Sequence, residues 1–234
     1  MKRSALFFVA VILLGFGLQS CDRECNNGCG DESDTTSVQW VDLALPSGLL
    51  WADRNVGAKN PEDYGNYYAW GETAPKEVYD WITYVFGNAY NTLTKYCNNS
   101  IYGMHGFTDS LTTLEVSDDA ATVNIGGEAR MPSDSEWQEL IDNTTSTWTT
   151  RNGVYGRLLT ASNGKSIFLP AAGGRFGSNF RFAGENGIYW SSSLYLDYPS
   201  YAWFFDFSSG NQYMDYCYLR NNGYSVRAVR AGKN

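Results

Sequence analysis

The residue types that catalyse most hydrolytic and transfer reactions are scarce in this 234-residue chain. His105 is the only histidine, so a Ser-His-Asp triad could form only through it, and a His-Glu-x-x-His zinc motif cannot form. Aspartate and glutamate number 25, but no pair is marked by its spacing as the two carboxylates of a glycosidase. We therefore expect no catalytic residue, no bound metal and no cofactor, and interpret the chain as a non-enzymatic protein.

Cysteine is the other reactive side chain, and the five cysteines have different contexts. Cys21 directly follows an apolar leader. Cys25 and Cys29 lie close together in a polar segment, where neither a second such pair nor a nearby histidine completes a zinc site. Cys97 and Cys217 could form a disulfide in an oxidising compartment or remain free thiols, and the sequence leaves both alternatives open.

A Tyr-rich stretch near the C-terminus has the composition of a recognition surface. Residues 189–224 contain 13 aromatic side chains, and no glutamate or lysine occurs between Asn186 and Gly232. Tyrosine offers a large contact area at low entropic cost, while Ser, Asn and Gly offer adaptable hydrogen bonds, as in antibody paratopes. The expected ligand-binding residues are Tyr195, Asp197, Tyr198, Tyr213, Asp215, Tyr216, Tyr218, Asn221 and Asn222.

The alternative is that these aromatic side chains fill the core. Trp203, Phe205 and Phe207 are spaced by two residues, as on one buried face of a strand. The tyrosines of the stretch alternate instead with carboxylates and amides, which a core could hold only with many hydrogen-bonding partners. The tryptophans expected in the scaffold are Trp51, Trp70, Trp137 and Trp203.

Short strands must position this stretch, because turn residues interrupt the chain at short intervals from Val38 onward. The clearest helix signal covers residues 133–141, where Ser133 and Glu136 form a capping box before apolar residues that share one helical face. A second, weaker helix is expected near Pro61–Asp63. This pattern predicts an α+β domain of mostly antiparallel strands with one or two helices. The expected strands are 39–43, 49–51, 166–169, 189–190, 201–207, 213–219 and 225–229, with a hairpin loop at 208–211.

The first 20 residues predict export. Lys2 and Arg3 precede a 14-residue apolar stretch, which is shorter than the roughly 20 residues that span a bilayer. The sequence Leu-Gln-Ser-Cys that ends at Cys21 resembles a bacterial lipobox, in which the cysteine is acylated and becomes the N-terminus. The alternative is ordinary cleavage that leaves an unmodified thiol. A leader over residues 1–20 and a lipidated Cys21 predict a protein that a lipid anchor alone holds on the bacterial outer membrane, at the cell surface.

Composition divides the remaining chain into a tether and a domain, and the net charge limits the classes of partner that the domain can bind. Residues 21–37 are polar and turn-rich, as in a flexible tether, and residues 38–234 suit a single domain. The formal charge is −8, and removal of the leader with its two basic residues leaves −10. An acidic domain without a basic stripe does not suit phosphate neutralisation, so nucleic acid is excluded. The expected partner is an unidentified protein or glycan outside the cell.

The domain contains, in this order, VDLALPSGLLWADRNVGA (41–58), PEDYGNYYAWGET (61–73), ARMPSDSEWQELID (129–142), SIFLPAAGGRFG (166–177), YWSSS (189–193) and YSVRAVR (224–230). Together these segments resemble the Fibrobacter succinogenes major paralogous domain, which is common in surface lipoproteins of gut Bacteroidetes. The resemblance spans nearly all of residues 38–231. It implies a C-type lectin-like fold, related to the formylglycine-generating-enzyme branch of that fold, and it implies a fold more strongly than a function.

The resemblance also brings alternatives to a binding function. The formylglycine-generating relatives act through a cysteine pair, and only Cys97 and Cys217 are available in this domain, neither of them in a matching motif. A divergent enzyme of that type and a structural component of a surface assembly are therefore the two alternatives. The Glu-Pro-Asn, Gln-Pro-Asp and Trp-Asn-Asp triplets of calcium-dependent sugar-binding lectins do not occur. Arg227 and Arg230 are expected to pair with internal carboxylates.

A further resemblance concerns variability. Some lectin-fold proteins are diversified by retroelements in their last segment, at codons that interchange Asn, Tyr, Asp and Ser. The stretch from Tyr195 to Asn222 is rich in these four residue types and lies between the YWSSS and YSVRAVR segments. We therefore hypothesise a variable, adhesive ligand-binding surface, for which adenine-biased differences from a nearby near-repeat in the gene would be the signature.

Overall fold

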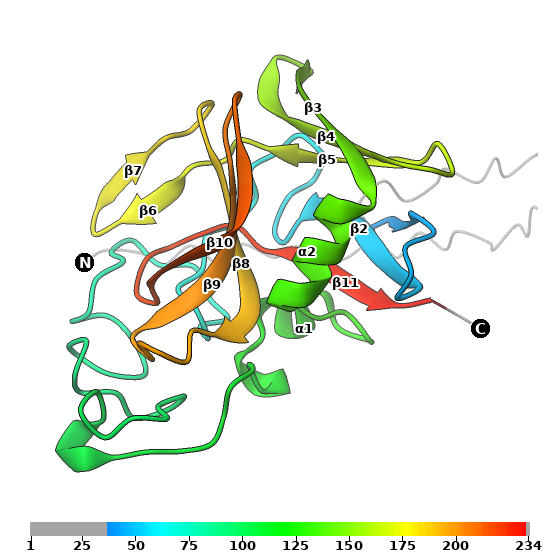
Figure 1. Ribbon diagram of the computed structural model, residues 1–234. Helices are drawn as coiled ribbons and strands as arrows, with labels where there is room; N and C mark the ends of the chain where they lie inside the picture. The colour runs from blue at the N-terminus through cyan, green and yellow to red at the C-terminus, as the bar shows by residue number, and fades with distance from the viewer. Residues whose placement is uncertain (1–36, 233–234) are drawn as a thin grey trace, which may run out of the picture. The chain divides into compact units, whose positions relative to one another are not determined.

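The computed structural model describes residues 37–232, apart from the side chains of Asp215 and Tyr216, and these residues belong to one compact unit (Figure 1). The expected leader, the expected lipidation site Cys21 and the tether up to residue 36 lie outside the described residues. Within residues 37–232, no helix is long and apolar enough to cross a membrane.

Antiparallel pairing organises the described strands into three three-stranded sheets and one two-stranded ribbon, with two α-helices and long irregular connections. The α+β class and the mostly antiparallel pairing expected from the sequence are therefore confirmed. The sheets are β1 (Trp40–Asp42), β2 (Leu49–Asn55) and β11 (Arg227–Ala231); β3 (Thr144–Arg151), β4 (Val154–Ala161) and β5 (Ser166–Pro170); and β8 (Gly187–Leu194), β9 (Tyr201–Phe207) and β10 (Gln212–Leu219). The ribbon pairs β6 (Gly174–Phe176) with β7 (Asn179–Arg181).

Helix α2 (Asp134–Asp142) begins at the predicted capping box. The Ser133 hydroxyl accepts a hydrogen bond from the backbone N–H of Glu136, and the Glu136 carboxylate accepts one from the backbone N–H of Ser133. This reciprocal pair satisfies two of the backbone donors that a helix start leaves free. Trp137 and Leu140 are fully buried beneath the helix, as their spacing predicts.

Two further local predictions have different outcomes. The hairpin loop at 208–211 is confirmed, because Ser208 N–H donates to the Asn211 carbonyl between the paired strands β9 and β10. The helix expected near residues 61–63 is wrong. The Asp63 carboxylate accepts hydrogen bonds from the backbone and side-chain N–H groups of Asn60, and this local bonding favours a turn over a helix.

Several elements were not expected from the sequence: the β3–β4 hairpin, the β6–β7 ribbon and helix α1. Strands β3 and β4 form a hairpin whose turn residues, Asn152 and Gly153, both have positive φ. Asn-Gly is a strong signal for this type of turn, and the preceding run is rich in threonine, so the hairpin was detectable. Helix α1 (Ala120–Ile125) is only six residues long and begins at Asp119, whose carboxylate accepts from the Thr122 N–H.

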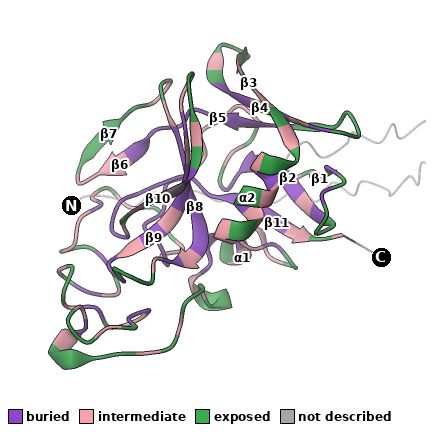
Figure 2. Ribbon diagram, in the orientation of Figure 1, coloured by how far each residue is buried: buried purple, intermediate pink, exposed green. Residues whose placement is uncertain are grey.

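The core has two main parts, one on each side of the β8–β9–β10 sheet. Strand β8 is buried along nearly its whole length and alternates between them: Tyr189 packs with Phe205 and Trp137, whereas Trp190 packs with Tyr224. Figure 2 shows this strand and β5 as largely buried, while α2 exposes its outer side. A strand buried on both faces accounts for the near-continuous apolar start of β8.

The two arginines of the last strand do not pair as expected. Arg227 is fully buried, and its guanidinium donates to the Asn55 side-chain oxygen at 3.0 and 2.7 Å and to two backbone carbonyls. Burial lowers the pKa of Arg227 to about 10. Arg230 lies 4.6 Å from the centre of the Trp40 ring. Within residues 37–232 neither forms an ion pair with a carboxylate, so that prediction is wrong; amide, carbonyl and ring groups supply the contacts instead.

Candidate functional site

The β8–β9–β10 sheet gives the Tyr-rich stretch two different faces. Residues paired across antiparallel strands lie on the same face, so Ile188, Asp206 and Tyr213 form one row across the three strands. Phe205, the preceding residue of β9, lies on the opposite face, where its ring centroid is 5.1 Å from that of Trp137. The stretch thus contributes one face to the core beneath α2 and the other to the side that carries β6 and β7.

Four tyrosines of the stretch form a continuous series of ring contacts, here called the tyrosine ladder (Tyr195, Tyr198, Tyr201 and Tyr218). Successive ring centroids are 6.0, 6.0 and 6.2 Å apart. Tyr198 and Tyr218 are 51% and 45% exposed, and the Tyr195 hydroxyl donates to Asp197 at 3.3 Å. The structure therefore brings four predicted site residues, Tyr195, Asp197, Tyr198 and Tyr218, into one partly exposed aromatic surface, with Tyr201 as the link that the sequence reasoning missed.

The remaining predicted residues do not all share this surface. Tyr213 is exposed on β10. Asp215 and Tyr216 belong to β10 as well, and their side chains lie outside the described part of the molecule. Asn221 and Asn222 are only 5% and 4% exposed, so their expected surface position is wrong.

The burial of these two asparagines has a structural cause. The Asn221 amide donates to the backbone carbonyl of Tyr79, and the Asn222 amide donates to the hydroxyl of Tyr224. Tyr224 lies in the turn region after β10, and Tyr79 lies in the long irregular segment that precedes α1. These hydrogen bonds therefore stabilise the chain where it leaves β10. The polar character of the two asparagines did not by itself indicate that their side chains are exposed.

An aromatic groove, with a cavity volume of about 320 Å³, opens between this sheet and the β6–β7 ribbon. Tyr218 of the tyrosine ladder lines it, so the ladder and the groove are continuous. The ring centroids of Phe176 and Phe204 lie 5.8 and 5.5 Å from that of Tyr224, which forms the almost fully buried floor. Five rings in all line the groove: Phe176, Phe182, Phe204, Tyr218 and Tyr224.

Two polar side chains and one aliphatic residue complete the groove lining: Asp206, Asn186 and Ile188. The Asn186 amide lies 3.5 Å from the Asp206 carboxylate. Burial raises the pKa of Asp206, and the hydrogen bond from Asn186 only partly opposes this. Sequence reasoning missed Asp206, although a lone acid in the apolar strand Ala-Trp-Phe-Phe-Asp-Phe was a usable signal.

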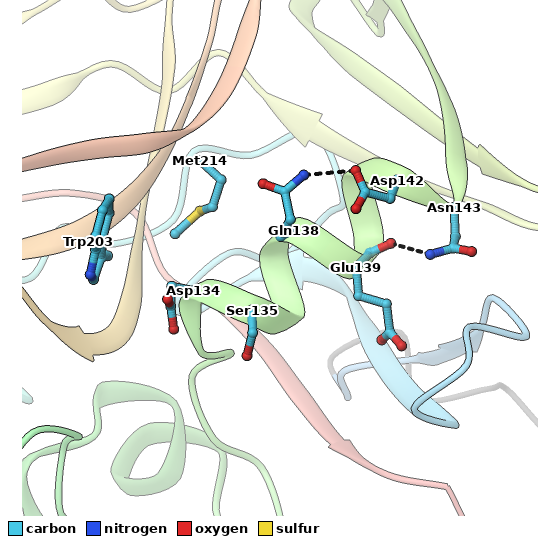
Figure 3. Close-up of a pocket in the computed structure, with 8 residues that line it drawn as sticks. All are labelled: Asp134, Ser135, Gln138, Glu139, Asp142, Asn143, Trp203 and Met214. Atoms are coloured by element: carbon cyan, nitrogen blue, oxygen red, sulfur yellow. Dashed lines mark hydrogen bonds between the residues drawn. The ribbon is translucent and has the colours of Figure 1, made fainter.

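A second concavity, of about 540 Å³, runs along the solvent side of α2, with Trp203 and Met214 facing the helix (Figure 3). Several of its polar groups bond locally: Gln138 donates to Asp142 at 2.8 Å, and the Asn143 amide donates to the Glu139 carbonyl at 2.8 Å. This arrangement is typical of the polar face of an amphipathic helix. We therefore regard the aromatic groove, rather than this concavity, as the candidate site.

The reactive side chains considered from the sequence lie apart from the groove lining. Cys97 is buried and Cys217 half-buried, and both are free thiols. Burial raises the pKa of each, which lowers the thiolate fraction at neutral pH. His105 is exposed in a short 3₁₀ turn. In the part of the chain that the structure describes, no three His, Cys, Asp or Glu side chains are grouped as metal ligands.

Comparison with known proteins gives one family match. A family model described as a domain of unknown function (DUF8237) matches residues 148–229, which are 82 of the 234 residues. The matched span contains every residue that lines the aromatic groove and all four residues of the tyrosine ladder. No curated protein and no solved structure matches the chain.

Proposed function

We propose that this protein is a surface-anchored, non-enzymatic binding module of C-type lectin-like fold that recognises a protein or glycan outside the cell. The observation that carries the proposal is the tyrosine ladder, a partly exposed series of ring contacts that runs into a groove lined by five aromatic side chains. Concave apolar sites with a few polar groups are where proteins usually bind ligands, and exposed tyrosines are frequent binding hot spots.

The sequence supports the finer parts of this proposal. The ordered segments shared with the Fibrobacter succinogenes major paralogous domain favour the C-type lectin-like fold and a role outside the cell. The apolar leader that ends at Cys21 favours a lipid anchor on the outer membrane. The Tyr-, Asn-, Ser- and Asp-rich composition of residues 195–222 favours a retroelement-diversified binding surface.

Glycan and protein arrays probed with the lipid-free domain test the binding function. We expect one ligand class to bind, and the double variant Tyr198→Ala/Tyr218→Ala to weaken its affinity about tenfold or more, because truncated hot-spot aromatics cost roughly 2 kcal/mol. Tyr155→Ala is the matched control, since Tyr155 is 50% exposed and stacks on Trp148 outside the ladder. Equal binding by the double variant and the parent would favour a structural role in a surface assembly.

The divergent-enzyme alternative depends on the two thiols of the domain. A Cys97→Ser/Cys217→Ser variant that keeps its fold and its array ligand would remove the formylglycine-generating interpretation. Loss of a thiol-dependent oxidation in that variant, with binding unchanged, would instead establish an enzymatic activity in addition to binding.

A further inference from the structure

Asp206 is a half-buried carboxylate without a cationic partner among the described residues, whereas several other half-buried carboxylates of the domain have one. Glu136 pairs with Arg130 at 2.5 Å, and Asp118 pairs with Lys95 at 2.6 Å. Glu72 pairs with a lysine in the same way. Across residues 37–232, no lysine or arginine lies within ion-pair distance of Asp206. Its hydrogen-bond partner is a neutral amide, so the charge of this carboxylate is not balanced within the domain.

The arginine that directly precedes Phe176 does not balance that charge, because its side chain lies on the other face of the strand. Arg175 and Phe176 are successive residues of β6, so their side chains point to opposite faces of the ribbon. Phe176 lines the groove. The Arg175 guanidinium instead lies 4.7 Å from the Phe180 ring centre and 5.5 Å from that of Tyr67. Arg175 is therefore directed away from Asp206, and Arg181 of the same ribbon is exposed and forms no ion pair with Asp206 within residues 37–232.

The walls of the groove add a second attraction for positive charge. The faces of aromatic rings attract cations, and the attraction grows to about 2 kcal/mol or more where the contact is shielded from water. The domain already uses this contact inside its own structure, since the Arg220 guanidinium lies 5.2 Å from the Trp70 ring centre. Five rings around one carboxylate without a cationic partner are thus complementary to a small organic cation.

The groove suits a sugar less well. A sugar ring needs several donors and acceptors to replace the water around its hydroxyl groups. The groove offers Asp206, Asn186 and the hydroxyl of the exposed Tyr218, whereas the Tyr224 hydroxyl is already bonded to Asn222. Its volume of about 320 Å³ is at the small end of ligand sites, as expected for an alkylammonium group rather than an oligosaccharide.

We propose that the aromatic groove binds an organic ammonium group, with Asp206 as its counter-ion and the surrounding rings as its cage. The ammonium could come from a lysine side chain of a protein partner or from a choline-type headgroup, because both present the same chemistry. This inference depends on the proposed binding function and names the chemistry that the groove contributes to it.

Isothermal titration calorimetry of the domain with tetramethylammonium, choline and Nα-acetyl-lysine-methylamide tests the inference. We expect millimolar or tighter binding of at least one cation, and no binding of the neutral isostere 3,3-dimethylbutan-1-ol. Tighter binding of the lysine amide would indicate a protein source, and tighter binding of choline a headgroup source. Absence of binding by all three cations, or equal binding of the neutral isostere, would overturn the proposal.

Two variants and one control assign the binding to the groove. Asp206→Asn should weaken cation binding at least tenfold, whereas Glu128→Gln, which removes an exposed carboxylate outside the groove lining, should leave it unchanged. Phe182→Ala removes a wall residue that is 46% exposed, so the fold should tolerate it, and we expect at least threefold weaker binding. If Asp206→Asn fails to fold, the test depends on Phe182→Ala, and an unchanged affinity of that variant for the cations would contradict the proposal.

The failure of this inference can be told apart from failure of the proposed function. An array ligand that depends on Tyr198 and Tyr218, together with no cation binding, would leave the binding module intact and remove only the ammonium subsite. A neutral glycan that depends on Asp206 would likewise overturn the choice of ligand chemistry while retaining the groove as a binding site.

Discussion

Replacing Arg227 by methionine measures whether neutral acceptors alone can stabilise a buried guanidinium. The side chain is fully buried and donates four hydrogen bonds, two to Asn55 and one each to the backbone carbonyls of Ala52 and Phe168. These bonds connect β11 to β2 and β5. Methionine keeps most of the aliphatic volume and removes every donor, so the variant isolates the polar contribution.

Two opposing terms set the expected magnitude. Hydrogen bonds from a charged group contribute roughly 1.5–3 kcal/mol each, whereas removing an ion from water costs several kcal/mol. Truncation also leaves the oxygen atoms of Asn55, Ala52 and Phe168 without this donor, at about 1–3 kcal/mol for each acceptor that finds no other. We therefore expect Arg227→Met to lower the free energy of unfolding by about 3–5 kcal/mol, because two or more buried acceptors would remain without a donor.

Urea unfolding followed by circular dichroism, with thermal melts in parallel, measures this change. A loss of that size corresponds to a melting temperature lower by roughly 6–20 °C for a domain of this length. Arg230→Met is the matched control on the same strand, because Arg230 is half-buried and its contact with the Trp40 ring contributes only about 0.5–1 kcal/mol. If Arg227→Met were within about 1 kcal/mol of the parent, the desolvation cost would cancel the hydrogen bonds and the reasoning would fail.

Two further predictions concern packing and pH. A Cβ atom on Gly187 would lie 2.0 Å from the Phe207 ring, so Gly187→Ala should cost about 1–3 kcal/mol in chemical denaturation. Gly210→Ala, which meets no atom within 4 Å, should change stability by less than about 0.5 kcal/mol; equal losses in the two variants would contradict the packing argument. Burial raises the pKa of Glu136, but the hydrogen bonds from Arg130 outweigh this and hold the pKa below its ordinary value. The stabilisation by Glu136 is therefore complete above the unfolded-chain pKa of about 4.3 and is lost as the pH falls through the lower folded value. Glu136→Gln should accordingly destabilise the domain at neutral pH, by an amount that shrinks below about pH 4, and a constant difference down to pH 2 would refute this.

In the proposed binding module, the tyrosine ladder and the aromatic groove would have different roles, one variable and one fixed. The ladder consists of exposed and half-buried tyrosines on a loop and at strand ends, where substitution disturbs little of the core. The floor of the groove is formed instead by Tyr224, which is 2% exposed and packs on Trp190. A diversified ladder could therefore change partner while the groove keeps its shape and its carboxylate.

Part of the candidate site could be predicted from composition alone. The alternation of tyrosine with carboxylates and amides in residues 189–224 predicted an exposed surface, and Tyr198, Tyr213 and Tyr218 are exposed, whereas Tyr189 and Tyr224 are buried. The same argument misplaced Asn221 and Asn222. A single amide can be buried when one carbonyl or hydroxyl lies opposite it, and here Tyr79 and Tyr224 provide those partners.

By itself, the sequence determined the features that depend on near neighbours. The capping box at Ser133, the extent of β9 and the hairpin loop at 208–211 follow from residues within one or two turns of chain, so their local signals were sufficient. Only the tertiary structure decided which charges would be balanced. Arg227 donates hydrogen bonds to Asn55, 172 positions away in the sequence. Asp206 lines the same groove as rings from the β6–β7 ribbon, which precedes it by some 30 residues. The local hydrophobic pattern of a sequence does not indicate such distant partners. The groove, and the absence of a cation beside Asp206 among the described residues, could therefore be identified only from the tertiary structure.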